Sequence, residues 1–446
     1  MESLNTRRMS ALASVPTANV GVASDLLGSG WNRRTWLKTA SLAGAGWLTP
    51  LASMLARADE QQGGRQRAQS VILLWMGGGA SQLETFDPHP GKDISGGTQA
   101  IETNVSGVKL AAGLPRLAEQ MDSISLIRNV VTREGDHERG TYLVKTGYSP
   151  LPVMVHPTLG AILCHALPIG QTDIPRHVSI LPGQWYGRGG FLGDQFDAFK
   201  IYDPLNPVPD LAARVPDDRM QKRLDDLQVV ENAFARGRMA RAKATLHADT
   251  VARARTMMTS DQLDAFDVSK ESAELRAKYG ETPFGRACLT ARRLTENGVR
   301  CVEVTLQGWD THASNHDGCK TQNNILDSAF AALIADLKER GQLETTIVIC
   351  ASEFGRTPSI NGFGGRDHWP GGFTVALAGG GIRGGRVLGR TDPDGARLTP
   401  AQGRKIADIH ATILKAVGLD PTVENIAPGP RPIKLSEGSA IAELLA

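Results

Sequence analysis

Apolar residues occur along this chain in short continuous runs, which alternate with longer stretches whose apolar positions recur at helical spacing. Continuous apolar runs bounded by glycine are typical of strands buried on both faces of a parallel sheet. We predict such strands over residues 70–76, 124–127, 177–181, 299–306, 345–351 and 373–378. The spaced pattern predicts helices over residues 156–166, 284–296, 324–340 and 401–417. Because the two kinds of element alternate, the sequence predicts an α/β fold, a mostly parallel central sheet with helices on both faces.

Residues 217–258 interrupt this alternation with a charged stretch that contains almost no glycine or proline. Within it, Leu224, Leu227, Val230 and Phe234 recur at helical spacing, so we predict a helical insertion. Two interpretations stay open for this insertion. It is either a lid or interaction arm, or a helical layer packed on the edge of the sheet.

The first 58 residues have the features of an export signal. Residues 32–38 read N-R-R-T-W-L-K, which resembles the twin-arginine signal, and a weakly apolar stretch and a small-x-small cleavage site follow. We therefore predict a signal peptide over residues 1–58 and one α/β domain over residues 59–446. The predicted location is periplasmic or extracytoplasmic, with no stable membrane span after cleavage. The alternative is an amphipathic N-terminal helix or an uncleaved anchor.

Charge and cysteine content exclude several classes of protein. The formal net charge of +2 falls to −2 without the leader, because the first 58 residues hold six basic and two acidic residues. A nearly neutral surface argues against nucleic-acid binding. The five cysteines are scattered and form no CxxC pair, which argues against a zinc ribbon and a disulfide scaffold. Two of them, Cys301 and Cys350, fall in strand-like runs and are predicted to be buried.

Side chains able to bind a metal or to act as acid and base follow three of the predicted strands. The motif W-D-T-H follows the strand ending at residue 306, and S-E-F-G-R-T-P follows the strand ending at residue 351. The motif G-R-D-H-W-P lies in a glycine-rich loop before residue 373. These motifs supply Asp310, His312, Glu353, Arg356, Asp367 and His368, and His316 and Asp317 come soon after the first. Because chemistry in such sheets sits beyond the carboxyl ends of the strands, we predict a metal or catalytic site there.

The same three motifs closely resemble those of an exported bacterial family, the domain of unknown function 1501. More broadly, the order of strand, glycines, D-x-H, S-E-x-G and D-H is similar to the alkaline phosphatase and sulfatase superfamily. The resemblance covers about residues 70–419. It implies an alkaline-phosphatase-like fold and a divalent metal ion, with Zn, Mn and Ca all compatible with mixed oxygen and nitrogen ligands.

Carried over residue by residue, the resemblance implies that Asp310, His312 and His368 hold one cation. Glu353 stands where the superfamily has an aspartate, and its usual histidine neighbour is replaced by phenylalanine. The aspartate that usually ends the first strand is replaced by glycine, with Asp87 and Gln82 as candidate substitutes. Glu353, Asp367 and His137 would then complete a second site, with Asp87 as a further candidate ligand, or they would serve as acid and base.

The position of the superfamily's nucleophile is occupied by His137, where neither Cys, Ser nor Thr is present. We consider His137 as a metal ligand, a general base, a phosphate-accepting nucleophile or a structural residue. Arg356 is the predicted cation that stabilises charge on the transferred group. Arg139 and Arg366 are further candidates for binding an anionic substrate.

These expectations together predict an exported metal-dependent hydrolase of a sulfate or phosphate ester. Its substrate would be a small-molecule or carbohydrate ester, with His137, Glu353 and Arg356 as the catalytic residues. The alternative is a catalytically inactive metal-binding or assembly protein on the same fold. Such a protein would be the partner of an exported cytochrome-domain protein, which the resemblance suggests.

Overall fold

The computed structural model describes residues 67–211, 213–238 and 245–446. The predicted signal peptide over residues 1–58 lies outside these described residues. Within the described ranges, no helix is long and apolar enough to cross a membrane. All five cysteines are free and buried, as expected for Cys301 and Cys350.

A nine-stranded sheet forms the centre of the domain, with the strand order β12-β4-β11-β8-β1-β7-β5-β6 and β15 beside β4. Its strands are β1 (Ser70–Gly77), β4 (Ile124–Val131), β5 (His177–Ile180), β6 (Phe199–Ile201), β7 (Cys301–Gln307), β8 (Thr346–Ala351), β11 (Phe373–Ala378), β12 (Val387–Leu388) and β15 (Arg404–Lys405). Strand β1 pairs in parallel with both β7 and β8, and only β11 runs antiparallel to its neighbours in this sheet. The predicted α/β fold with a mostly parallel sheet is therefore confirmed.

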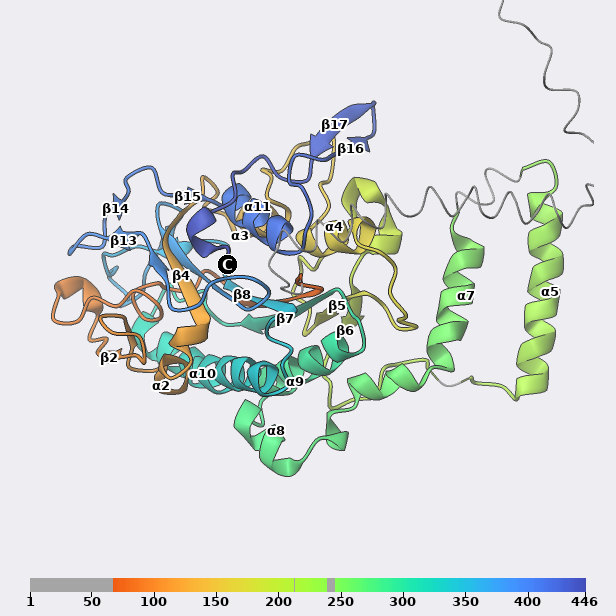
Figure 1. Ribbon diagram of the computed structural model, residues 1–446, viewed down its shortest axis with the longest axis horizontal. Helices are drawn as coiled ribbons and strands as arrows, with labels where there is room; N and C mark the ends of the chain where they lie inside the picture. The colour runs from red at the N-terminus through yellow and green to blue at the C-terminus, as the bar shows by residue number, and fades with distance from the viewer. Residues whose placement is uncertain (1–66, 212, 239–244) are drawn as a thin grey trace, which may run out of the picture. The chain divides into compact units, whose positions relative to one another are not determined.

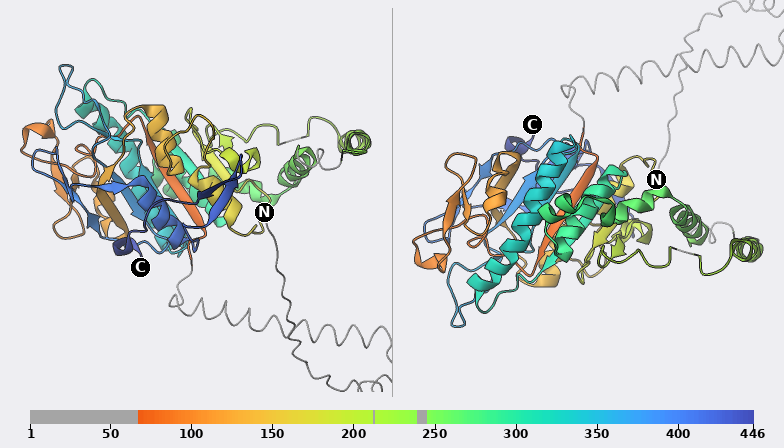
Figure 2. Two further views of the ribbon diagram at one scale, coloured as in Figure 1. Left: turned by 90° about the horizontal axis from the view of Figure 1, so that it is seen from above. Right: turned by 90° about the horizontal axis from the view of Figure 1, so that it is seen from below.

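Two layers of helices cover the sheet, as Figures 1 and 2 show. The helices are α2 (Pro115–Ala118), α3 (His137–Thr146), α4 (Leu159–Ala166), α5 (Asp217–Ala235), α7 (His247–Met258), α8 (Ala273–Tyr279), α9 (Pro283–Glu296), α10 (Asn315–Glu339) and α11 (Ile406–Ala416). Short strand pairs lie outside the central sheet: β2 (Ala100–Glu102) with β3 (Lys109–Ala111), β9 (Gly355–Arg356) with β10 (His368–Trp369), β13 (Arg390–Thr391) with β14 (Leu398–Thr399), and β16 (Glu424–Ala427) with β17 (Arg431–Lys434).

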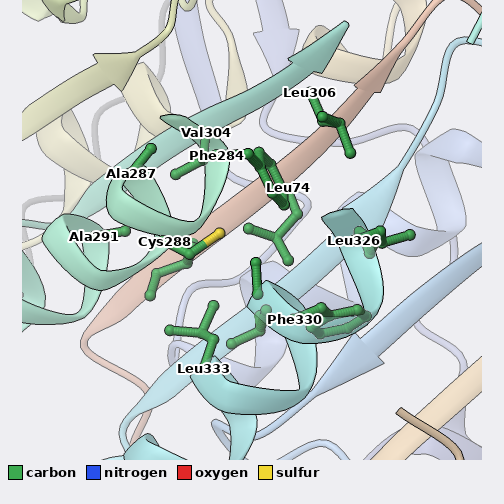
Figure 3. Packing of buried hydrophobic residues seen from close by; sticks show 14 of the residues in the cluster. Leu74, Phe284, Ala287, Cys288, Ala291, Val304, Leu306, Leu326, Phe330 and Leu333 are labelled. Atoms are coloured by element: carbon green, nitrogen blue, oxygen red, sulfur yellow. The ribbon is translucent and has the colours of Figure 1, made fainter. Parts of the chain in front are cut away.

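Alternation along β1 explains why the sheet needs both layers. Ile72, Leu74 and Met76 belong to one buried apolar cluster, and Val71 and Trp75 belong to another. In a strand, successive side chains point to opposite faces, so each cluster lies on its own face of the sheet. The first cluster includes residues of α9 and α10, and Figure 3 shows their side chains gathered over β1. The second includes residues of α4 and α11.

The charged stretch from residue 217 to residue 258 contains the two helices α5 and α7. None of the residues of α5 is buried, and its Val229, Val230 and Phe234 are exposed. Helix α7 buries Met257 at its end. The described parts of the stretch, residues 217–238 and 245–258, are thus largely helical.

Candidate metal centre

Four segments that are distant in sequence meet at the carboxyl edge of the sheet. Asp310 and His312 follow β7, and Glu353 follows β8, which lies on the other side of β1 from β7. His137 is the first residue of α3. His368 lies in β10, which pairs with β9 so that His368 is opposite Arg356. Parallel strands bring their ends to one edge, and the short β9–β10 pair returns the glycine-rich loop to that edge.

Three imidazole rings surround the carboxylate of Asp310. The Nε2 atom of His137 lies 3.4 Å from Asp310 Oδ2. The Nε2 atoms of His312 and His368 lie 3.1 Å and 3.4 Å from Asp310 Oδ1. The same two Nε2 atoms are 3.0 Å apart. All three rings therefore turn the same nitrogen toward one carboxylate.

The other nitrogen of each ring, Nδ1, faces an oxygen acceptor. The acceptors are Glu353 Oε1 for His137 at 2.8 Å, the carbonyl oxygen of Gly135 for His368 at 2.8 Å, and Asp367 Oδ1 for His312 at 3.1 Å. A proton on Nδ1 satisfies each of these acceptors and leaves a lone pair on each Nε2. This is the arrangement by which proteins orient histidine ligands of metal ions.

The spacing of these atoms fits a metal ion. Imidazole nitrogens bind Zn²⁺ at about 2.0–2.1 Å, so neighbouring ligands of a tetrahedral site are roughly 3.3–3.4 Å apart. The separations of 3.0–3.4 Å around Asp310 are close to that value. Donor atoms of His137, Asp310 and His368 all lie within 4.8 Å of one another. We infer that this group can hold a cation, with His312 beside it.

Glu353 is buried next to the centre, with only 2% of its surface exposed. Its Oε1 accepts hydrogen bonds from His137 and from the backbone N–H of Gly78, the latter at 2.9 Å. Gly78 has a φ of 119°, and a Cβ there would lie 2.4 Å from the backbone nitrogen of Asp310. The glycine at this position thus allows the end of β1 to approach the centre closely. The hydrogen bond with Glu353 raises the pKa of His137.

Arg356 is completely buried and holds Asp310 in place. Its Nη2 donates to Asp310 Oδ1 at 2.5 Å, and its Nε donates to the carbonyl oxygen of Gly79 at 2.8 Å. Burial alone would raise the pKa of Asp310, but the hydrogen bond and charge of Arg356, together with His137 and His368, outweigh it and lower the pKa. Burial also lowers the pKa of His368, and nearby Arg356 lowers it further. Asp310 is therefore held ionised and His368 neutral, which suits metal binding.

The remaining residues expected at the site lie around this centre or apart from it. Asp367 is exposed. Of the three imidazole rings in the described centre, it contacts that of His312, at Nδ1. Asp87 is buried, accepts a hydrogen bond from Thr391 at 2.7 Å and pairs with Arg128 at 3.3 Å. Its carboxylate is therefore already part of an ion pair with Arg128, and we leave Asp87 out of the proposed centre.

Gln82 hydrogen-bonds to the backbone of Arg356. Arg366 is buried in an ion pair with Glu84 at 2.7 Å.

Several residues of the centre were missed in the sequence analysis. The carbonyl of Gly135 orients His368, and Ser352 Oγ lies 3.1 Å from Glu353 Oε2. The Nδ2 of Asn361 donates to Asp367 Oδ1 at 3.2 Å and to the carbonyl of His312 at 3.0 Å. Backbone carbonyls have no signature in sequence. Ser352, however, adjoins the predicted Glu353 and could have been found.

The fold and this centre define an α/β protein with a candidate metal site at the carboxyl edge of its sheet. The chain belongs to the family described as protein of unknown function (DUF1501), whose model matches residues 68–445. No curated protein matches the chain.

Solved structures with a similar fold include enzymes. The chain is similar to the PsFucS1 sulfatase from Pseudoalteromonas sp., with 13% identity over 80% of this chain and 70% of the other, at a TM-score of 0.34. It is similar to a TAB5 alkaline phosphatase variant with Mg bound (14% identity, 80% and 99% covered, TM-score 0.34). It is also similar to the C-terminal periplasmic domain of EcEptC from Escherichia coli in complex with Zn (9% identity, 85% and 92% covered, TM-score 0.37). Similarities of this size leave the function to be argued from the residues of the centre.

Proposed function

We propose that this protein is an exported, metal-dependent hydrolase of a sulfate or phosphate ester. One divalent cation would be held by Asp310, His368 and His137, with His312 as a fourth ligand. The observation that carries the proposal is the convergence of three Nε2 atoms on one carboxylate, each with its Nδ1 hydrogen-bonded to oxygen. A divalent cation in such a site polarises the ester and lowers the pKa of bound water.

The protein residues then have distinct tasks in this proposal. Glu353 holds the His137 ring through Nδ1, and Asp367 holds the His312 ring in the same way. Arg356 keeps the Asp310 carboxylate ionised and oriented. Because its guanidinium is fully buried, we propose that Arg356 positions a ligand and does not contact the substrate. Three nitrogen donors favour Zn or Mn over Ca, which prefers oxygen ligands.

A second candidate function is metal-dependent binding or assembly without turnover, with an exported cytochrome-domain protein as the partner. The observation that favours it is the absence of a Ser, Thr or Cys nucleophile at the start of α3. His137 occupies that position instead, and its Nδ1 is already hydrogen-bonded to Glu353. Hydrolysis in the first candidate must therefore use water as the attacking group.

Hydrolysis of p-nitrophenyl phosphate and p-nitrophenyl sulfate by the purified full chain tests this proposal. We expect turnover of at least one ester, its loss after chelation, and its return when Zn or Mn is added back. Turnover that survives chelation would contradict the metal-dependent mechanism. A metal-loaded protein that hydrolyses neither ester would favour the binding function.

Replacing Glu353 by Gln is expected to weaken metal binding by about 10–100-fold, the usual effect of losing a carboxylate that orients a histidine ligand. The matched variant is Asp367→Asn, because Asp367 has the same task toward His312 but is 61% exposed. We expect a smaller loss for Asp367→Asn, since water can replace an exposed acceptor. The metal affinity is measured by competition with a chromogenic chelator. Equal losses, or none for Glu353→Gln, would contradict the proposed roles.

A further inference from the structure

A cavity of about 270 Å³ opens directly beside the candidate metal centre. His137, Asp310 and Glu353 form one of its walls, so the cavity and the centre are continuous. The other walls come from the ends of β1 and β7, from α3 and from the loop after β5. They contain Trp75, Gly77, Gly78, Thr141, Lys145, Gly183, Gln184, Trp185, Thr305, Gln307 and Gly308.

Uncharged polar groups without a protein partner line this cavity. Thr141 and Thr305 are only 2% and 3% exposed. Their side-chain hydroxyls, and the amides of Gln184 and Gln307, form no hydrogen bond with any of the described residues. Buried polar groups in proteins almost always have a partner. The hydroxyls of the two nearly buried threonines therefore point to a ligand with hydrogen-bonding groups of its own, and the exposed Gln184 and Gln307 have side-chain amides free to bind the same ligand.

The glycines of the cavity wall leave room for the amide of Gln307. A Cβ at Gly77 would lie 2.6 Å from Gln307 Oε1, and a Cβ at Gly183 would lie 2.7 Å from Gln307 Nε2. Both approaches are too close for a side chain. The two glycines thus allow the amide to sit at the end of β7, next to Asp310 on the cavity wall.

The charges around the cavity disfavour a second anion. Lys145 is the one Lys or Arg among the lining residues, and it is buried in an ion pair with Glu303 at 3.0 Å. Its Nζ also donates to the carbonyl of Trp185 at 2.8 Å. Asp310 and Glu353 also line the cavity and contribute two carboxylates. The cavity thus adds no free cation to the metal centre.

We propose that this cavity is a subsite for a single uncharged ring bearing several hydroxyl groups, the size of one sugar residue. This inference rests on the proposed function, because the ring would belong to the ester that the metal centre cleaves. Hydroxyl groups both donate and accept, as do the two amides and two threonine hydroxyls. The partly exposed Trp185 offers an indole surface for apolar contact with the carbon face of a ring. A volume of about 270 Å³ is below the usual range of about 300–1,000 Å³ for small-molecule sites, which favours one ring over an extended chain.

Calorimetric titration of the full chain with neutral monosaccharides tests the subsite separately from activity. The probes are glucose, galactose and N-acetylglucosamine, with glucuronate as an anionic and cyclohexanol as an apolar comparison. We expect at least one neutral sugar to bind, with tenfold or greater weakening in Gln307→Ala and in the nearly isosteric Thr141→Val. The control is Gln228→Ala on the exposed helix α5, which should bind as the unmodified protein does. Thermal unfolding checks that each variant is folded.

The outcomes separate this inference from the proposed function. Tight metal binding together with no binding of any neutral sugar would overturn the subsite and leave the hydrolase intact. Binding of glucuronate or cyclohexanol as tightly as the neutral sugars would also overturn the subsite. Sugar binding that is weakened in Gln307→Ala supports the subsite even if the protein holds no metal, in which case the hydrolase alone fails.

Discussion

Replacing Glu303 by Gln is expected to destabilise the domain by about 3–5 kcal/mol, because it leaves the charge of Lys145 buried without its partner. Glu303 lies in the middle of β7, and the side chains of Glu303 and Lys145 are 2% and 5% exposed. Glu303 Oε2 also accepts a hydrogen bond from the backbone N–H of Gly187 at 3.0 Å. A glutamine keeps the shape and the Gly187 contact, so the expected loss comes from the missing charge.

Two variants control this prediction, with the free energy of unfolding measured in urea. The double variant Lys145→Met/Glu303→Gln removes both charges and should recover most of the lost stability. Glu102→Gln breaks an ion pair with Lys109 of 2.7 Å on the surface, where both side chains are more than half exposed, and should have little effect. If Glu303→Gln lowers the free energy of unfolding no more than Glu102→Gln does, the buried ion pair stabilises the domain no more than the surface pair, which would contradict the prediction.

The same pair predicts how stability depends on pH. Burial by itself would raise the pKa of Glu303, but the charges and hydrogen bonds of Lys145 and His177 together outweigh it and lower the pKa to about 2. A lowered pKa in the folded state means that the stabilisation is complete above the usual glutamate value of about 4.3. It is lost as the pH falls toward about 2. Glu303→Gln should therefore flatten the loss of stability over this pH range.

The order of strands and helices could be predicted because hydrophobic periodicity carries that information. Every predicted strand and helix overlaps an observed element, and the motifs after β7 and β8 meet because parallel strands end at one edge. Helix α10 begins at Asn315, nine residues before the predicted start at residue 324. Its first turns are polar and contain Gly318, so they lack the apolar spacing. Tertiary contacts hold them instead, such as the hydrogen bond of 2.7 Å from Asn323 Nδ2 to the carbonyl of Glu84.

The direction of individual side chains could not be read from the motifs. An arginine after a strand-end carboxylate suggests a substrate-binding cation, but Arg356 turns inward to Asp310 and to backbone carbonyls. Asp87 is close in sequence to the end of β1, yet the chain between them turns the carboxylate toward Arg128 and Thr391. Such contacts depend on the path of loops, which local patterns do not specify.

The double variant Asp310→Ala/His368→Ala is expected to lose the bound cation and to hydrolyse esters about a thousandfold more slowly, or worse. A bound cation supplies several kcal/mol of transition-state stabilisation, and about 1.4 kcal/mol corresponds to a factor of ten in rate. The side chains of Asp310 and His368 are 48% and 23% exposed and fill no core space. Asp310→Ala nevertheless leaves the buried Arg356 without its carboxylate, so we expect some loss of stability, and thermal unfolding checks that the variant is folded. Arg356 keeps its hydrogen bonds to backbone carbonyls.

The matched control changes a second aspartate and histidine close in sequence. His316 and Asp317 are exposed on the first turn of α10, and His316 Nδ1 contacts Thr98 at 3.2 Å. We expect His316→Ala/Asp317→Ala to keep both metal and activity. An equal loss in this control would mean that the effect does not depend on the proposed ligands.

The metal content of the purified full chain, with the Asp310→Ala/His368→Ala variant beside it, tests the central claim most directly. Elemental analysis by mass spectrometry should find about one tightly bound Zn or Mn per native chain and almost none in the variant. A native protein without metal, even after reloading with Zn or Mn, would contradict the metal centre and the hydrolase built on it.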